Sequence, residues 1–322
     1  MDPRVQESQP EAGAAPSADV KGPNLFVVGA PRCGTTALHD LLAQHPDIYM
    51  SPAKEPHFFN GDINRAFVEY QGQTNDPLTW DLEPYLRLFA GAGEQAYRGE
   101  SSVYYLFSPE AVERIHGFNP KARIVIMLRD PHEFQRSLHA RLRQAGDEDC
   151  ADFVRAMDLE KERRQGRQIP STVRFPEILF YSHYAEFSRW IAAYQAKFGP
   201  EQVKVMLLED MQRDGQASYS DLLAFLGVAD HPVPARANRN GNLEPRFDFI
   251  IRYLYKRGRR RTMGRFHSRL ERWNTRAATR RELDPADRER LRAAHLPEVQ
   301  KLSGMLGRDL VKLWGYGDAG GA

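Results

Sequence analysis

The stretch 24–38 constrains the fold of this chain more than any other part of the sequence. A short apolar run, 25–28, is followed by Gly29 and Gly34 with four residues between them. An apolar strand, a glycine-bounded loop and a helix in this order are typical of a phosphate-binding loop. The backbone N–H groups of such a loop and the N-terminus of its helix bind an anion. The stretch therefore predicts a parallel α/β fold with an anion site after its first strand.

The residues after the second glycine restrict which anion fits. A loop that binds the terminal phosphates of ATP needs Lys and then Ser or Thr at this point. Thr35 stands at the lysine position, Thr36 follows it, and the fixed cation is Arg32 inside the loop. The loop thus suits a nucleotide whose transferable group carries less charge. An ordinary strand-to-helix turn is the alternative interpretation.

Apolar runs and helical periodicity predict strands that alternate with helices along the chain. The predicted strands are 25–28, 123–128 and 203–208, and the predicted helices are 36–44, 131 to about 143, 184–198, 219–226 and 285–306. This alternation predicts an α/β fold with a single three-layer domain, in which helices flank a parallel sheet. Ligands bind at the carboxyl ends of such strands, where Arg32 and Arg129 fall.

Composition divides the chain into three parts. Residues 1–23 are rich in Pro, Ala, Gly, Ser, Gln and Glu and are expected to form a disordered tail. The domain is expected to span 24–316, with a short tail at 317–322. No apolar run approaches the roughly 20 residues of a membrane span, and no signal peptide is recognisable. The two cysteines, Cys33 and Cys150, offer no disulfide framework, so a cytoplasmic protein is expected.

The segment 252–281 concentrates positive charge. It holds twelve Lys or Arg residues and one acid, Glu271, although the whole chain has a net charge of only +2. Three interpretations remain open: a solvated helical face, a flap over a nucleotide or anionic acceptor, and a nucleic-acid-binding surface.

Six ordered segments carry a resemblance to a known family. Residues 31–38 resemble the 5′-phosphosulfate loop of sulfotransferases that use 3′-phosphoadenosine 5′-phosphosulfate (PAPS). The other matching segments are 54–59, 99–105, 124–137, 182–190 and 205–210. The resemblance covers nearly everything after residue 23. It implies a PAPS-dependent enzyme, with PAP (3′-phosphoadenosine 5′-phosphate) as the product and no metal requirement.

The resemblance also assigns the residues that bind the nucleotide. The residues implied for the 5′-phosphosulfate are Arg32, Cys33, Gly34, Thr35, Thr36 and Ala37. Arg129 and Ser137 match the pair that binds the 3′-phosphate, and a guanidinium with a hydroxyl suits a dianion. Tyr184 matches a tyrosine that contacts adenine. A structural ion pair for Arg129 and a core position for Tyr184 are the alternatives.

The run 54–59, Lys-Glu-Pro-His-Phe-Phe, resembles the motif of heparan-type sulfotransferases whose glutamate is the general base. Glu55 is therefore the first catalytic candidate, and His57 is a second base or orients the acceptor. Lys54 would keep Glu55 charged, and Arg32 would stabilise charge without proton transfer. Neighbouring phenylalanines are expected to desolvate Glu55 and raise its basicity.

The chain departs from that pattern at two places. Heparan-type relatives have a lysine near 100–102, where this chain has serines. Their Lys-Gly-Arg loop has only a weak counterpart at 257–259.

The resulting hypothesis is sulfuryl transfer from PAPS to a hydroxyl group, with an amine as the alternative. The acceptor would be a small molecule, lipid, glycan or carrier-bound group, and anionic acceptors are included. A P-loop-like kinase and a non-enzymatic nucleotide- or nucleic-acid-binding module are the rival hypotheses.

Overall fold

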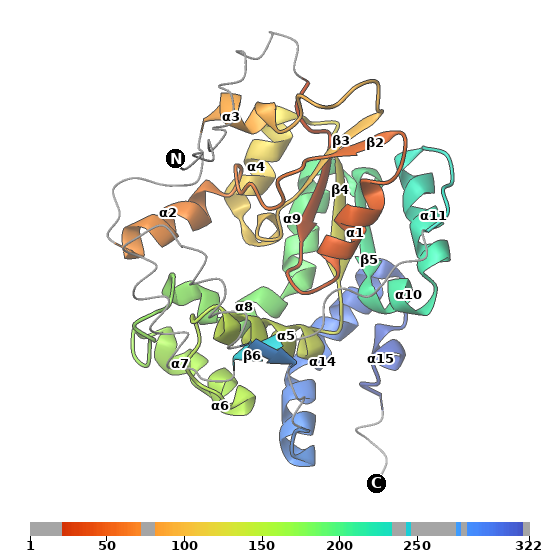
Figure 1. Ribbon diagram of the computed structural model, residues 1–322. Helices are drawn as coiled ribbons and strands as arrows, with labels where there is room; N and C mark the ends of the chain where they lie inside the picture. The colour runs from red at the N-terminus through yellow and green to blue at the C-terminus, as the bar shows by residue number, and fades with distance from the viewer. Residues whose placement is uncertain (1–20, 72–80, 234–242, 246–274, 278–281, 318–322) are drawn as a thin grey trace, which may run out of the picture.

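A parallel sheet of five strands forms the centre of the molecule (Figure 1). The computed structural model describes residues 21–71, 81–233, 243–245, 275–277 and 282–317. The strands are β1 (Leu25–Gly29), β2 (Ile48–Met50), β3 (Tyr97–Ser101), β4 (Arg123–Leu128) and β5 (Val203–Leu207). Their order is β2-β3-β1-β4-β5, and every neighbouring pair is parallel. The carboxyl ends of β3, β1 and β4 therefore lie side by side.

Helices cover both faces of the sheet. The longer ones are α1 (Thr35–Leu42), α2 (Gly61–Tyr70), α4 (Pro109–Phe118), α5 (Pro131–Gln144), α9 (Phe187–Phe198), α11 (Gly215–Leu226) and α14 (Pro285–Leu306). The shorter ones are α3 (Leu82–Arg87), α6 (Phe153–Asp158), α7 (Glu160–Arg163), α8 (Tyr181–Ala185), α10 (Leu208–Arg213) and α15 (Leu310–Leu313). Figure 1 shows α1 in front of the sheet and α4 and α9 behind it. On the front face Tyr219 of α11 donates a hydrogen bond to the carbonyl of Leu41 in α1. These layers confirm the predicted α/β fold.

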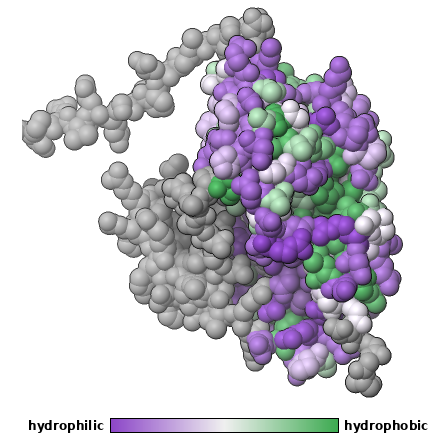
Figure 2. Space-filling model, turned by 90° about the vertical axis from the view of Figure 1, so that its right-hand side faces the viewer, coloured by the Kyte–Doolittle hydropathy of each residue, from purple (hydrophilic) through white to green (hydrophobic). Residues whose placement is uncertain are grey.

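The core consists of the central strands and the helix faces that pack on them. All five residues of β1 are buried, and so are the last five residues of β4. Strands buried on both faces read as continuous apolar runs, which is why these two could be predicted. Figure 2 shows a mostly hydrophilic outer face on which hydrophobic residues form smaller groups.

Two predicted helices are present, one with the predicted bounds and one with an earlier start. The helix at Pro285–Leu306 begins after the capping residue Asp284 and ends at Gly307, which adopts φ 61°. The helix predicted at 219–226 begins earlier, at Gly215, because the Asp214 carboxylate accepts a hydrogen bond from the Ala217 N–H.

The single helix predicted at 184–198 was wrong. The structure has two helices there, α8 and α9, with Glu186 between them in a non-helical conformation. The indole N–H of Trp190 donates to the carbonyl of His183, 3.3 Å away, and so occupies an acceptor at this break.

Two features lie outside the sheet. A pair of three-residue strands, β6 (Leu243–Pro245) and β7 (Thr275–Ala277), is antiparallel and packs near α5. Residues 1–20 of the predicted tail and most of the basic segment 252–281 lie outside the described residues. Within the described ranges, none of the helices is long and apolar enough to cross a membrane.

Candidate active site

The glycine-bounded loop connects β1 to α1, as its sequence predicts. Gly34 adopts φ 88°, and a Cβ there would lie 2.9 Å from Leu208 Cδ1, so any side chain would be strained and crowded. A Cβ on Gly29 would approach Leu106 Cβ to 2.7 Å. Cys33 is fully buried, and burial raises the pKa of its thiol. The cysteine therefore fits a packing role rather than a nucleophilic one.

The remaining loop residues open α1. Thr35 is buried, Thr36 is half-buried and Ala37 is exposed on the first turn of the helix. The first turn of a helix leaves backbone N–H groups without helical partners, which is the property an anion site uses.

Arg32, Arg129 and Ser137 converge at the carboxyl ends of β1 and β4. Arg32 Nε donates to Ser137 Oγ at 3.2 Å, and Arg129 Nη1 lies 3.5 Å from the Arg32 carbonyl oxygen. Ser137 is almost fully buried on α5, two turns after the strand end. Arg129 also faces Glu133 at 3.5 Å, but its buried Nε has no hydrogen-bond partner among the described residues. The three side chains thus gather donors around one place.

Arg141 adds a charge that the sequence analysis missed. Burial lowers the pKa of Arg32, and the positive charges of Arg141 and Arg129 lower it further. Arg141 lies four residues after Ser137 on α5, so both belong to one face of that helix. This spacing was the available signal. Guanidinium groups that repel one another make the site a strong candidate for anion binding.

The segment that contains Glu55 lies against the carboxyl end of β3. The Glu55 N–H donates to the Ser101 carbonyl at 2.9 Å, and the His57 N–H donates to Ser102 Oγ at 3.3 Å. Lys54 Nζ lies 3.2 Å from Glu55 Oε1, and His57 Nε2 lies 3.6 Å from Glu55 Oε2. One carboxylate therefore lies between two basic groups.

The expected rise in the basicity of Glu55 is wrong for this structure. Burial raises the pKa of Glu55, but contact with His57 and the charge of Lys54 together lower it to about 2. The rings of Phe58 and Phe59 are buried and pack on Tyr85. The Glu55 side chain is 39% exposed.

Backbone strain coincides with the candidate residues. Four described non-glycine residues have positive φ, and three of them are Arg32 (65°), Glu55 (59°) and His57 (53°). Such conformations cost about 1–3 kcal/mol each and gather at functional sites. The fourth residue, Gln168, lies outside the predicted site.

The structure also shows the surroundings of Tyr184 and of the position where heparan-type relatives have a lysine. Tyr184 is buried in an aromatic cluster, with its ring 4.7 Å from that of Phe107, so its contact with adenine stays a prediction. Ser101, near the missing lysine, is fully buried and its Oγ lies 2.9 Å from His39 Nδ1. The weak match at 257–259 lies outside the described residues.

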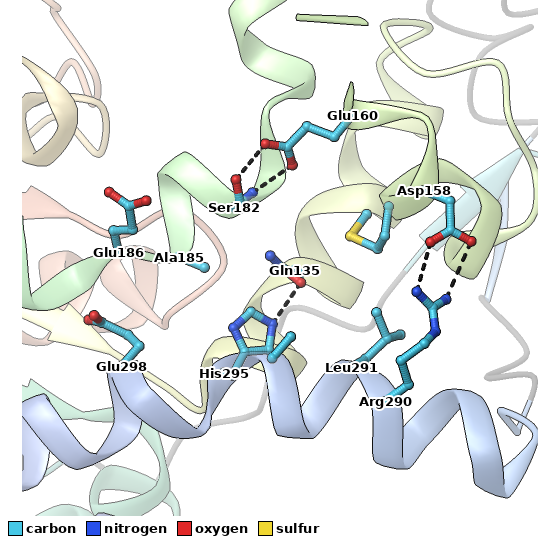
Figure 3. A pocket seen from close by; sticks show the side chains of 12 residues that line it. Gln135, Asp158, Glu160, Ser182, Ala185, Glu186, Arg290, Leu291, His295 and Glu298 are labelled. Atoms are coloured by element: carbon cyan, nitrogen blue, oxygen red, sulfur yellow. Dashed lines mark hydrogen bonds and ion pairs between the residues drawn. The ribbon is translucent and has the colours of Figure 1, made fainter. Parts of the chain in front are cut away.

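A cavity of about 300 Å³ lies elsewhere, between α5–α8 and α14 (Figure 3). None of the predicted site residues lines it. Its carboxylates already have partners: Asp158 pairs with Arg290, and Glu160 accepts from Ser182. We therefore assign it no role. Across the described ranges, no cluster of His, Cys, Asp and Glu side chains is arranged to hold a metal ion.

Comparisons with known proteins identify a family for this chain. The model described as "Sulfotransferase family" matches residues 23–232. Human carbohydrate sulfotransferase 15 is 27% identical over 146 residues, which cover 34% of this chain and 26% of that protein. Mouse heparan sulfate glucosamine 3-O-sulfotransferase 6 is 30% identical over 109 residues, which cover 34% of this chain and 27% of that protein. The chain thus spans about a quarter of the length of these relatives.

The crystal structure of a sulfotransferase from Alicyclobacillus acidocaldarius has a TM-score of 0.65 at 29% identity, and the match covers 90% of this chain and 97% of that one.

Proposed function

Because the chain belongs to the sulfotransferase family, we propose that it transfers the sulfuryl group of PAPS to a hydroxyl group. The observation that carries the proposal is the meeting of two groups of residues at neighbouring strand ends. Arg32, Arg129 and Ser137 gather at β1 and β4, and the strained Glu55 segment lies against β3.

The donor fits the basic group of residues. PAPS carries a 3′-phosphate and a 5′-phosphosulfate, and when bound it would supply the sulfuryl group. Arg129 and Ser137 would hold the 3′-phosphate, and the Nε of Arg129, which has no hydrogen-bond partner within the described ranges, gives that anion a donor. Arg32, the backbone N–H groups of 33–35 and the Thr36 hydroxyl would hold the 5′ end.

The acidic side of the site would activate the acceptor. Glu55 takes the proton of the attacking acceptor hydroxyl. At the same time the acceptor oxygen forms a bond to sulfur, and the bond between sulfur and the oxygen of the leaving 5′-phosphate breaks. Arg32 and the loop N–H groups stabilise the negative charge that develops on that phosphate. Lys54 keeps Glu55 ionised, and His57 orients the acceptor or replaces Glu55 as the base. This scheme assigns no step to a metal ion.

The names of the relatives suggest the first acceptors to test. They include a carbohydrate sulfotransferase and a heparan sulfate glucosamine 3-O-sulfotransferase, so saccharide hydroxyls come first. Lipids, small molecules and carrier-bound groups come next. A cytoplasmic location and the domain limits 24–316 stay predictions.

The test has a binding arm and a transfer arm. Calorimetry should show that PAP binds, and ³⁵S-labelled PAPS should label at least one compound in a panel of neutral and acidic oligosaccharides, lipids and phenols. Arg32→Ala should abolish labelling. Failure to bind PAP would overturn the proposal. PAP binding without labelling would support the donor site and exclude the tested compounds as acceptors.

A further inference from the structure

A fully buried carboxyl group, Glu100, lies beneath the candidate catalytic segment. Its oxygens accept hydrogen bonds from three hydroxyl groups: Tyr85 at 2.6 Å, Ser102 at 2.7 Å and Tyr105 at 3.0 Å. Glu100, Ser102 and Tyr105 have no exposed surface, and Tyr85 is 1% exposed. Burying a carboxyl group is costly unless its oxygens have partners. These hydroxyl groups therefore make the position of Glu100 tolerable.

Two of the three hydroxyl groups continue into the catalytic segment. Ser102 Oγ accepts the N–H of His57 at 3.3 Å, and the Tyr105 hydroxyl accepts the N–H of Phe59 at 3.2 Å. Because each hydroxyl donates its proton to Glu100, its lone pairs are directed toward these backbone groups. The third hydroxyl, on Tyr85, has Glu100 as its only hydrogen-bond partner among the described residues.

These contacts hold the part of the backbone that is strained. Glu55 and His57 have positive φ, and a residue keeps such a conformation only when its surroundings fix it. The carbonyl of His57 is fixed as well, because Asn64 Nδ2 donates to it at 2.8 Å. The bonds of alternate N–H groups in 55–59 to Ser101, Ser102 and Tyr105 supply the rest of that constraint.

We propose that Glu100 is a positioning residue, which acts through Ser102 and Tyr105 to hold Glu55 and His57 in the geometry needed for proton transfer. The inference rests on the proposed function, since it assigns Glu100 to the same site. Glu100 is fully buried, so it acts through its neighbours rather than as a catalytic residue. A carboxyl group suits the role because both of its oxygens can accept, whereas an amide would turn a donor toward one of the hydroxyl groups.

The test compares two tyrosine variants. Tyr105→Phe and Tyr85→Phe each remove one buried hydroxyl that donates to the same oxygen of Glu100. They differ because only the Tyr105 hydroxyl also binds the catalytic segment. Ser102→Ala removes the second link, and Glu100→Gln disturbs both. Thermal unfolding and PAP affinity establish that each variant is folded.

Two measurements decide the outcome. Amide hydrogen exchange of 55–59 should accelerate at least tenfold in Tyr105→Phe and Ser102→Ala but change less than threefold in Tyr85→Phe. With ³⁵S-labelled PAPS and the best acceptor of the panel above, kcat should fall about 10- to 100-fold in those two variants while PAP affinity is kept. In Tyr85→Phe it should fall less than threefold, and Ser102→Ala should add little to Glu100→Gln.

Other results would overturn the proposal. Unchanged exchange and kcat in Tyr105→Phe and Ser102→Ala would do so, and so would equal losses in Tyr85→Phe and Tyr105→Phe, which would indicate general destabilisation. If the wild-type protein does not bind PAP, the proposed function fails, but the exchange measurement still decides whether Glu100 orders the segment.

Discussion

The assignment of Arg129 to a 3′-phosphate makes a quantitative prediction about nucleotide affinity. PAP carries this phosphate and AMP does not. The Arg129 side chain is only 16% exposed, and its contacts to Glu133 and to the Arg32 carbonyl are both long, at 3.5 Å. A dianion beside Arg129 would therefore form well-directed hydrogen bonds, and Arg129 would give up only these long contacts. Arg129→Ala should weaken PAP binding and leave AMP binding nearly unchanged.

The magnitude follows from the number of donors and their present partners. One hydrogen bond to a charged group contributes about 1.5–3 kcal/mol, or about 10- to 150-fold in affinity. A bidentate contact could double that free energy. However, Glu133 competes for the guanidinium, and removing Arg129 relieves its repulsion of Arg32. We therefore expect a loss of about 100-fold for PAP.

Calorimetry with PAP and AMP on three proteins provides the assay. Arg136→Ala is the matched control, because Arg136 is 18% exposed and faces the same carboxylate, Glu133, from the same helix. It should weaken PAP far less than Arg129→Ala does. Equal affinity of the wild-type protein for PAP and AMP would refute the reasoning, and so would an equal loss for both nucleotides in Arg129→Ala.

Three further predictions concern the metal, the base and a structural ion pair. Sulfuryl transfer should survive EDTA, because Thr35 stands where a magnesium-dependent loop needs lysine; loss with chelator and rescue by magnesium would favour the kinase hypothesis. Glu55→Gln should reduce turnover about 10²- to 10⁴-fold and keep PAP affinity. Because a base must be deprotonated, kcat/KM for PAPS should fall only as pH drops toward about 2, and a fall near neutral pH would count against Glu55 as the base. Arg163→Ala should lower the free energy of unfolding by about 3–5 kcal/mol, because it leaves the buried carboxylate of Glu148 without its positively charged partner, whereas Arg167→Ala breaks an exposed pair of the same 2.6 Å length and should cost far less.

The sequence predicted those strands whose burial is visible as apolar runs. Strands β1, β4 and β5 are such runs. Arg129 directly follows β4, and Arg32 lies three residues after the end of β1. Strand β3 was not predicted, because its buried residues are Gly99, Glu100 and Ser101. Polar residues are buried there only because hydrogen-bond partners from distant parts of the chain come together, and no local pattern records that.

The same reason separates the predicted site residues from the missed ones. Glu55 and His57 belong to one short motif and could be recognised together. The role inferred for Glu100 depends on the bonds from Ser102 and Tyr105 to the backbone of His57 and Phe59, 45 and 46 positions away, and the glutamate looks like any surface acid in the sequence. Arg141 could have been found from its four-residue spacing to Ser137, but its effect on Arg32 depends on how α5 packs beside the loop.

The low pKa of Glu55 bears on when this residue can act as a base. In the protein without nucleotide, His57 and Lys54 hold its pKa at about 2, far below the range in which a carboxylate accepts a proton efficiently at neutral pH. An anionic nucleotide bound beside Lys54 would offset part of that positive charge and raise the pKa of Glu55. Glu55 would then become a stronger base only when the donor is in place. The pH at which kcat falls should consequently lie above the pH at which kcat/KM for PAPS falls, because only kcat reports the protein with its donor bound. Equal values would mean that the donor does not reach the charges around Glu55.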